Sequence, residues 1–139
     1  MSGSAPVRDY AIDQMNRLLT TLAFRVHLAA KSPGPDQIHD VRVGIRRFSQ
    51  GLRMFGDFFP KREAKKIRKL LKRMMRLTSK IRDRDIALEY LAELKHDQHR
   101  QRLEKERAAY EREFSEMTSR WSGRDFSVKW RRGLALRRV

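Results

Sequence analysis

The chain has 139 residues, which is enough for one domain with a hydrophobic core, and it contains no cysteine. The lack of cysteine excludes disulfide bonds and thiolate metal sites, and no apolar run is long enough for a membrane span or a secretory signal. The 33 basic and 17 acidic residues give a formal net charge of +16, which repels itself in a compact chain and therefore predicts an anionic partner.

Helical periodicity runs along most of the sequence, whereas the alternation typical of strands is nearly absent. A first helix is predicted over residues 7–30 and ends at residues 31–35, where two prolines cannot continue the helical hydrogen bonds. Asp36 is predicted to cap a second helix that closes at Pro60. The apolar seam of this second helix steps by three and four residues and consists of Val41, Ile45, Phe48, Leu52, Phe55 and Phe59.

A third helix is predicted from Lys61, directly after a proline, to about His96, either unbroken or bent near Thr78 and Ser79. A fourth helix follows with an apolar side of its own, and Gly123 is its expected stop.

These four amphipathic segments, joined by short connections, predict an all-α fold, an antiparallel four-helix bundle over residues 1–122. The remaining residues, 123–139, form a basic tail that carries too many apolar side chains for a purely solvated segment. We expect this tail either to dock on the bundle or to cross to a second copy of the chain.

The positive charge is concentrated in two segments rather than spread evenly, as a general solubility device would be. Residues 61–85 contain 12 basic and 3 acidic side chains, a net charge of +9, and residues 122–139 carry a net charge of +5. Residues 86–121, by contrast, have a net charge of −1. This distribution predicts that particular faces of the protein bind the anion.

In the third helix, five cationic residues recur every three or four positions, opposite the apolar seam. The row consists of Lys65, Lys69, Lys72, Arg76 and Lys80. A solvated helix face is the usual explanation of such a run, but it normally interleaves acidic residues to limit repulsion. No acidic residue occurs between Lys65 and Arg82, so we interpret the row as a polyanion-binding surface.

The second helix carries a comparable row of His39, Arg42, Arg46 and Arg53 on the side away from its apolar seam. Arginine suits phosphate because its planar fork donates two parallel hydrogen bonds, and histidine titrates near neutrality. The alternative is a stripe of arginines that are paired with nearby aspartates.

Asp83 and Asp85 belong to the third helix, where Asp85 projects toward the seam and a carboxylate facing a core must be paired. We predict that both are structural and hold Arg46 or Arg47 of the second helix in position. A paired-carboxylate catalytic or metal site is the competing interpretation, which the surrounding cations disfavour. The sequence therefore predicts no catalytic residue, no metal site and no cofactor.

Three stretches carry a resemblance to a known family: IHDVRVGIRRF at residues 38–48, LRMF at residues 52–55, and the segment 77–86 with its RDRD string. In this order and spacing they resemble the CHAD family, the conserved histidine α-helical domain, over about residues 36–94. The resemblance implies an all-helical domain that binds inorganic polyphosphate, often beside a triphosphate-tunnel hydrolase.

The residues that the resemblance implies as phosphate contacts, by motif position, are His39, Arg42, Arg46 and Arg47. Two positions depart from the family pattern, because Ser49 stands where an arginine is favoured and Ser79 where a glycine is favoured. A typical member is about twice as long, with two similar four-helix halves. This chain resembles one half, so we expect a homodimer that rebuilds the full groove.

These features together predict a non-catalytic domain that binds polyphosphate along its basic rows. We expect it in the cytoplasm or on polyphosphate granules, with a polyphosphate-metabolising enzyme such as a triphosphate-tunnel hydrolase as a further partner. The main alternative is an RNA- or DNA-binding basic helical module, which would need aromatic side chains beside its cations for base stacking. A phosphate-processing enzyme and a protein held on anionic lipid are weaker alternatives.

Overall fold

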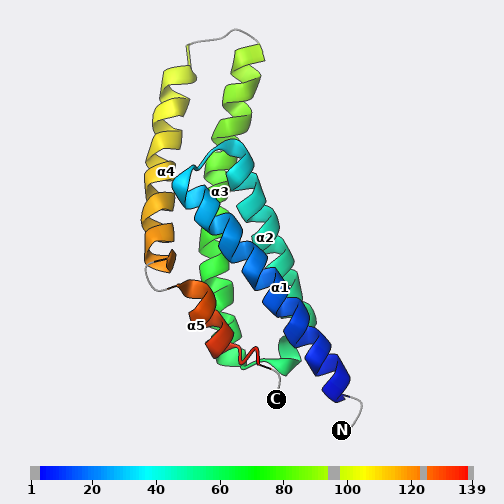
Figure 1. Ribbon diagram of the computed structural model, residues 1–139. Coiled ribbons are helices and arrows are strands. Elements are labelled where there is room, and N and C mark those ends of the chain that lie inside the picture. Colours follow the sequence, from blue (N-terminus) through cyan, green and yellow to red (C-terminus); the bar gives the residue numbers. More distant parts are fainter. Residues whose placement is uncertain (1–3, 94–97, 123–124, 138–139) are drawn as a thin grey trace.

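The structure is a computed structural model that describes residues 4–93, 98–122 and 125–137. Its regular elements are α1 (Ser4–Lys31), α2 (Pro35–Met54), the short 3-10 helix η1 (Gly56–Phe58), α3 (Lys61–Glu93), α4 (Arg100–Ser122) and α5 (Phe126–Gly133) (Figure 1). The predicted all-α class is therefore confirmed for these ranges. No helix within them is long and apolar enough to cross a membrane.

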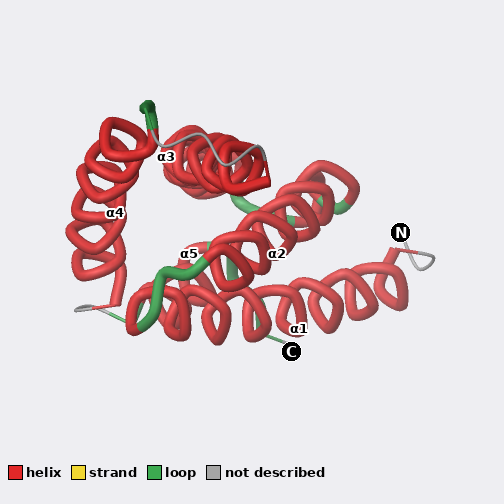
Figure 2. Tube along the Cα trace, turned by 90° about the horizontal axis from the view of Figure 1, so that it is seen from above, coloured by secondary structure: helices red, strands yellow, loops and turns green. Residues whose placement is uncertain are grey.

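The four long helices pack as two antiparallel pairs, α1 with α2 and α3 with α4. The pairs meet where α2 contacts α3 and α1 contacts α4, and the view along the molecule shows them crossing at an angle (Figure 2). The C-terminal part of α3 and the N-terminal part of α4 project beyond the α1–α2 pair (Figure 1). One end of the molecule is thus a two-helix hairpin rather than a complete bundle.

The hydrophobic core follows the periodicity of each helix. On α2, the predicted seam residues Val41, Ile45, Phe48 and Leu52 are all buried, since every third or fourth side chain of a helix returns to the same face. Buried residues of α1, α3, α4 and α5 belong to the same cluster. One continuous core therefore holds all five α-helices together.

The ends of α2 differ from the prediction. The first residue of the helix is Pro35, and Gly34 is its N-cap residue. Asp36 therefore lies inside the first turn and does not cap the helix. The helix ends at Met54 rather than at Pro60, and η1 follows. Proline requires an extended conformation of the residue before it, and Phe59 has φ −121° and ψ 154°, so the chain must leave the helix before Pro60.

α3 is continuous from Lys61 to Glu93, with no interruption at Thr78 and Ser79. Thr78 is fully buried, and its hydroxyl donates to the carbonyl of Met74 within the same helix, which satisfies the polar group without breaking the helix. The predicted end near His96 and the predicted stop at Gly123 lie outside the described residues.

The tail contains the fifth helix and docks on its own chain. Trp130 of α5 stacks on Phe48 of α2, with 5.8 Å between the ring centroids. The rings of Trp121 and Phe126 also pack against Trp130, with 5.2 and 4.8 Å between the ring centroids. Among the described residues of the tail, the buried apolar ones are Phe126, Trp130, Leu134 and Leu136. In the structure of the single chain, the tail packs on the helices of its own chain.

Candidate functional site

The polar side of α2 lies between its buried positions. His39, Arg46, Arg47 and Arg53 are exposed, whereas Arg42 is half-buried against α3. α2 therefore offers an exposed face of histidine and arginine to solvent, with one arginine turned into the contact between two helices.

Arg42 joins α2 to α3. Its Nη1 atom donates to the backbone carbonyl of Met75 at 2.8 Å and to Oγ1 of Thr78 at 3.0 Å. Hydrogen bonds from a charged donor to neutral acceptors are worth more than neutral ones, particularly when they are partly shielded from water. Arg42 thus has a packing role that its place in a row of cations did not reveal.

The charges around Arg42 form one electrostatic neighbourhood. Burial is the main cause that lowers the pKa of Arg42, the positive charge of Arg46 lowers it further, Asp83 raises it, and Arg82 lowers it again. Arg42 and Arg46 were predicted for the site, but Arg82 was not. The RDRD string that contains Arg82 could have indicated it, because residues 82 and 78 are one turn apart on the side of α3 that meets α2.

A basic groove lies where the end of α2, η1 and the start of α3 meet. It has a volume of 620 Å³. Its lining consists of Leu52, Arg53, Gly56, Asp57, Lys61, Lys65, Arg68, Lys69 and Lys72. The antiparallel packing of α2 and α3 thus brings Arg53 of one predicted row beside three lysines of the other. Lys61 and Arg68 were missed, although each lies about one turn from Lys65 on the same helix.

The other predicted cations do not line this groove. His39, Arg46 and Arg47 lie farther toward the N-terminus of α2, beyond the groove. Lys80 lies farther along α3, with its Nζ atom 5.2 Å from the centroid of the Tyr110 ring on α4. Arg76 is exposed outside the groove lining. The two predicted rows therefore meet at the η1 end and diverge toward the α3–α4 hairpin.

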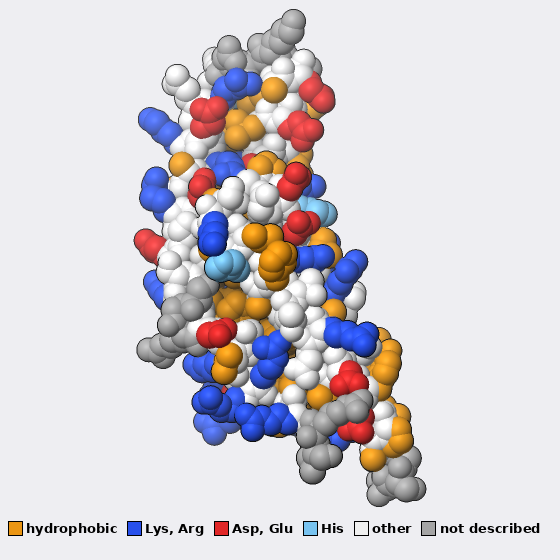
Figure 3. Space-filling model, viewed as in Figure 1, with side chains coloured by type: hydrophobic (Ala, Val, Ile, Leu, Met, Phe, Trp, Pro, Cys, Tyr) orange, Lys and Arg blue, Asp and Glu red, His pale blue; other side chains and the backbone are white. Residues whose placement is uncertain are grey.

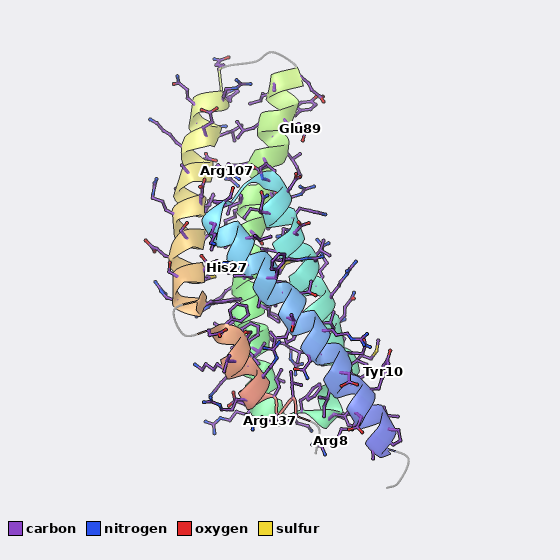
Figure 4. All side chains as sticks on the ribbon, in the orientation of Figure 1. Arg8, Tyr10, His27, Glu89, Arg107 and Arg137 are labelled. Carbon is purple, nitrogen blue, oxygen red and sulfur yellow. The ribbon has the colours of Figure 1, made fainter. Side chains whose placement is uncertain are left out.

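The partner predicted for Asp85 is wrong. Asp85 pairs with Arg107 of α4 rather than with an arginine of α2, and both side chains are largely buried, with exposed fractions of 9% and 16%. Arg107 also binds Glu111 and donates to the backbone carbonyl of Pro33 at 2.8 Å (Figure 4). Arg46 and Arg47, the expected partners, are exposed. A helix can pair with either neighbour, and the sequence does not show which one its inward carboxylate faces.

Asp83 differs from Asp85 because it is exposed, on the outer side of α3. Its carboxylate lies close enough to Arg42 to raise the pKa of that arginine. Asp83 therefore contributes to the charge balance of the site rather than to the packing of the core.

The chemistry of the groove favours an anion. Six of its nine lining residues are cationic, and Asp57 is the one carboxylate among them. Within the described ranges, no three His, Cys, Asp or Glu side chains gather as metal ligands would. Guanidinium and ammonium groups along an open groove can hold the oxygens of several phosphate groups at once.

A family model for the CHAD domain matches residues 14–134 of the 139-residue chain. The chain belongs to the CHAD domain family. The matched range includes the groove and extends through α5, so it covers the tail as far as residue 134. Membership points to a polyphosphate-related function. No curated protein and no solved structure shows significant similarity to the chain.

Proposed function

We propose that this CHAD domain is a non-catalytic binding protein for inorganic polyphosphate. The observation that carries the proposal is the groove between α2, η1 and α3, in which six cations face one carboxylate. A polyphosphate chain carries about one negative charge per phosphate, so a groove of this composition relieves the repulsion among its own cations when it is occupied.

The ligand follows the line of positive charge. Lys61, Lys65, Arg68, Lys69 and Lys72 contact phosphates from α3, and Arg53 contacts them from α2. The exposed side chains of His39, Arg46 and Arg47 extend the path along α2, and Arg76 extends it along α3. Release of counterions from the polymer supplies much of the binding free energy, as it does for nucleic acids.

The lining of the groove supports polyphosphate over nucleic acid. Its non-cationic members are Leu52, Gly56 and Asp57, and none of the lining residues is aromatic. Proteins that bind single strands without sequence preference stack bases on aromatic side chains beside their cations. Competition between long-chain polyphosphate and single-stranded RNA tests this, because equal displacement by RNA would favour the nucleic-acid alternative.

The non-catalytic part of the proposal has its own test. The protein is incubated with long-chain polyphosphate and magnesium, and the release of orthophosphate is measured. No release above the buffer control is expected, and steady release that follows the concentration of the protein would assign the domain to phosphate-processing enzymes instead.

A homodimer is a further part of the same proposal. In the C-terminal part of α3, Ile86 and Tyr90 are 51% and 61% exposed. An apolar surface of this kind on an incomplete bundle supports association with a second copy. Light scattering at micromolar concentration should give twice the mass of the chain, and a monomer under these conditions would remove the dimer from the proposal.

The location and the partner enzyme follow from the ligand. A domain that binds polyphosphate in the cytoplasm is expected to collect on polyphosphate granules and to meet enzymes that metabolise the polymer, including triphosphate-tunnel hydrolases. Imaging of a fluorescent fusion tests the location, with a groove variant such as K65Q/K69Q as the control. Granule association that survives this substitution would separate the location from the groove.

A further inference from the structure

A second basic concavity lies at the other side of the η1 end of the molecule. It has a volume of 390 Å³ and is lined by Arg8, Arg131, Arg132, Ala135 and Arg137. Figure 3 shows Lys and Arg side chains gathered over α5 and beside the C-terminal end, and Figure 4 marks Arg8 and Arg137 at this end. Arg8 of α1 meets three arginines of the C-terminal segment here, and no carboxylate is among the described residues that line the pocket.

The fold holds one of these arginines in a fixed orientation. Arg131 donates from Nε to Oδ1 of Asn16 at 3.1 Å and from Nη2 to Oγ1 of Thr20 at 2.6 Å. Asn16 donates in turn to the backbone carbonyl of Leu136 at 3.2 Å, which ties the segment after α5 to α1. The pocket wall is therefore organised before any ligand arrives, which lowers the entropy cost of binding.

The segment after α5 is also held in a strained conformation. Ala135 has φ 54°, in the left-handed region that side chains other than glycine rarely adopt. Leu134 and Leu136 on either side of it are buried in the core, so packing compensates for the strain. The result is a sharp turn that carries Arg137 back toward Arg131 and Arg132. Strain of this kind concentrates at functional sites.

The remaining arginines of the pocket form no ion pair within the described part of the chain. The guanidinium groups of Arg8, Arg132 and Arg137 make no hydrogen bond or ion pair with the described residues. Glu63 approaches Gly133 at the end of α5, but it is ion-paired with Lys66 of its own helix at 3.6 Å. Like charges that share a pocket repel one another unless an external anion joins them.

We propose that this arginine pocket is a second anion-binding site, and that it takes a compact phosphate group rather than the middle of a chain. The α2–α3 groove has a volume of 620 Å³ and four of its six cations are lysines, whereas this pocket has a volume of 390 Å³ and its four cations are all arginines. Guanidinium forks donate in pairs to the several oxygens of one phosphate, and a terminal phosphate carries more charge than an internal one.

Two sources supply such a group. One is a small free phosphate such as pyrophosphate, and the other is the end of a polyphosphate chain whose middle occupies the groove. The second source rests on the proposed function of the groove, whereas the first does not. Both require the same residues, so the experiment must separate the pocket from the groove and the chain end from the free ion.

The test uses calorimetric titration of the full chain at low salt with three ligands: pyrophosphate, long-chain polyphosphate, and the same polymer with its terminal phosphates capped by an amine. The pocket variant is R8Q/R137Q, which leaves the structural Arg131 intact. The groove variant is K65Q/K69Q. The control is K105Q/R112Q, which removes two exposed charges of α4 that make no hydrogen bond or ion pair with the described residues. Circular dichroism confirms that each variant is folded.

The expected result is that R8Q/R137Q weakens pyrophosphate binding by about tenfold or more, whereas the groove and control variants change it by about twofold or less. If the same variant also weakens the uncapped polymer but not the capped one, the natural occupant is the chain end; if it weakens pyrophosphate alone, the occupant is the free ion.

The proposal is overturned if the wild-type chain binds no pyrophosphate and R8Q/R137Q handles both polymers as the control does, or if all three double variants weaken pyrophosphate equally. Polymer binding that depends on K65Q/K69Q would leave the groove proposal intact in that case. Conversely, loss of pyrophosphate binding in R8Q/R137Q, with no polymer binding by any variant, would support the pocket and reject the groove.

Discussion

Arg42 donates a hydrogen bond from Nη1 to the backbone carbonyl of Met75, 2.8 Å away on the neighbouring helix. The same atom reaches Thr78, so one arginine connects α2 to the middle of α3. Arg46, one turn later on α2, is exposed. Two arginines of the same predicted row therefore have different roles, since Arg42 joins two helices and Arg46 faces solvent.

The first prediction follows from this difference. Arg42→Gln should lower the free energy of unfolding by about 1.5–3 kcal/mol, since it removes a charged donor from a partly buried contact. Arg46→Gln should change it by about 0.5 kcal/mol or less, because it alters an exposed side chain. Urea denaturation measures both values. Equal losses in the two variants would show that the bonds of Arg42 to α3 contribute nothing to stability.

The pair between Asp85 and Arg107 should be the most costly ion pair to break. Asp85→Asn leaves the largely buried Arg107 with one acidic partner fewer, so we expect a loss of about 2–4 kcal/mol. The exposed pair between Arg102 and Glu106 is the matched control, and Arg102→Gln should cost about 0.5 kcal/mol or less. Urea denaturation at fixed pH gives both numbers, and a loss in Asp85→Asn as small as that of the control would refute the assignment.

The salt dependence of polyphosphate binding should depend on the lysines of the groove. K65Q/K69Q/K72Q removes three cations from its lining, so the slope of log K against log salt should fall in magnitude by about 2–3. The affinity at low salt should fall in parallel. Titrations at several salt concentrations measure both quantities.

The control for this prediction is K105Q/R112Q/R120Q, which removes three exposed charges of α4. If binding depends on net charge alone, the two triple variants will lose the same affinity and the same slope. A localised groove requires the α4 variant to keep nearly all of both.

Two glycines of the same region should respond differently to substitution by alanine. A Cβ atom at Gly51 would lie 2.5 Å from Sδ of Met15, which is fully buried. Gly51→Ala should therefore lower the free energy of unfolding by about 1 kcal/mol or more, even though alanine has the higher helix propensity. At Gly56, a Cβ would meet nothing within 4 Å, so Gly56→Ala should be neutral or slightly stabilising. Thermal unfolding of the two variants compares them, and a more stable Gly51→Ala would contradict the close packing.

Docking of α5 makes a prediction about both stability and concentration. Trp130→Ala removes a side chain that stacks on Phe48, and it should cost about 3–5 kcal/mol, whereas Val128→Ala on the exposed side of α5 should cost little. Because α5 docks on its own chain, the loss in Trp130→Ala should not depend on protein concentration. A loss that shrinks on dilution would indicate that the tail packs on a second copy instead.

The periodicity of apolar residues was sufficient to predict the helices and their buried faces, because it depends only on residues close together in the sequence. Val41, Ile45, Phe48 and Leu52 lie every three or four residues and are buried together, as their spacing predicts. The end of α2 was less predictable, since the same spacing continues to Phe59 across a break. Pro60 restricts only Phe59 before it, so it shows that the helix must end before Pro60 but not that it ends at Met54.

The sequence pattern predicted which residues of the candidate site are surface cations, but not how they are grouped. The lysines of α3 and Arg53 of α2 were identified as surface cations, but a periodic row does not say which helix lies beside it. The structure turns Lys80 toward Tyr110 of α4 and groups Arg53 with Lys65.

The sequence by itself determined the all-α class, the apolar face of each helix and the excess of positive charge on α3 and the tail, because each depends on residue type and on spacing within one segment. Only the tertiary structure decided that Asp85 pairs with Arg107, that Arg42 binds Met75, and that Arg8 shares a pocket with Arg137. These contacts join residues from 22 to over 100 positions apart, and they depend on the rotation of each helix about its axis and on which neighbour it meets.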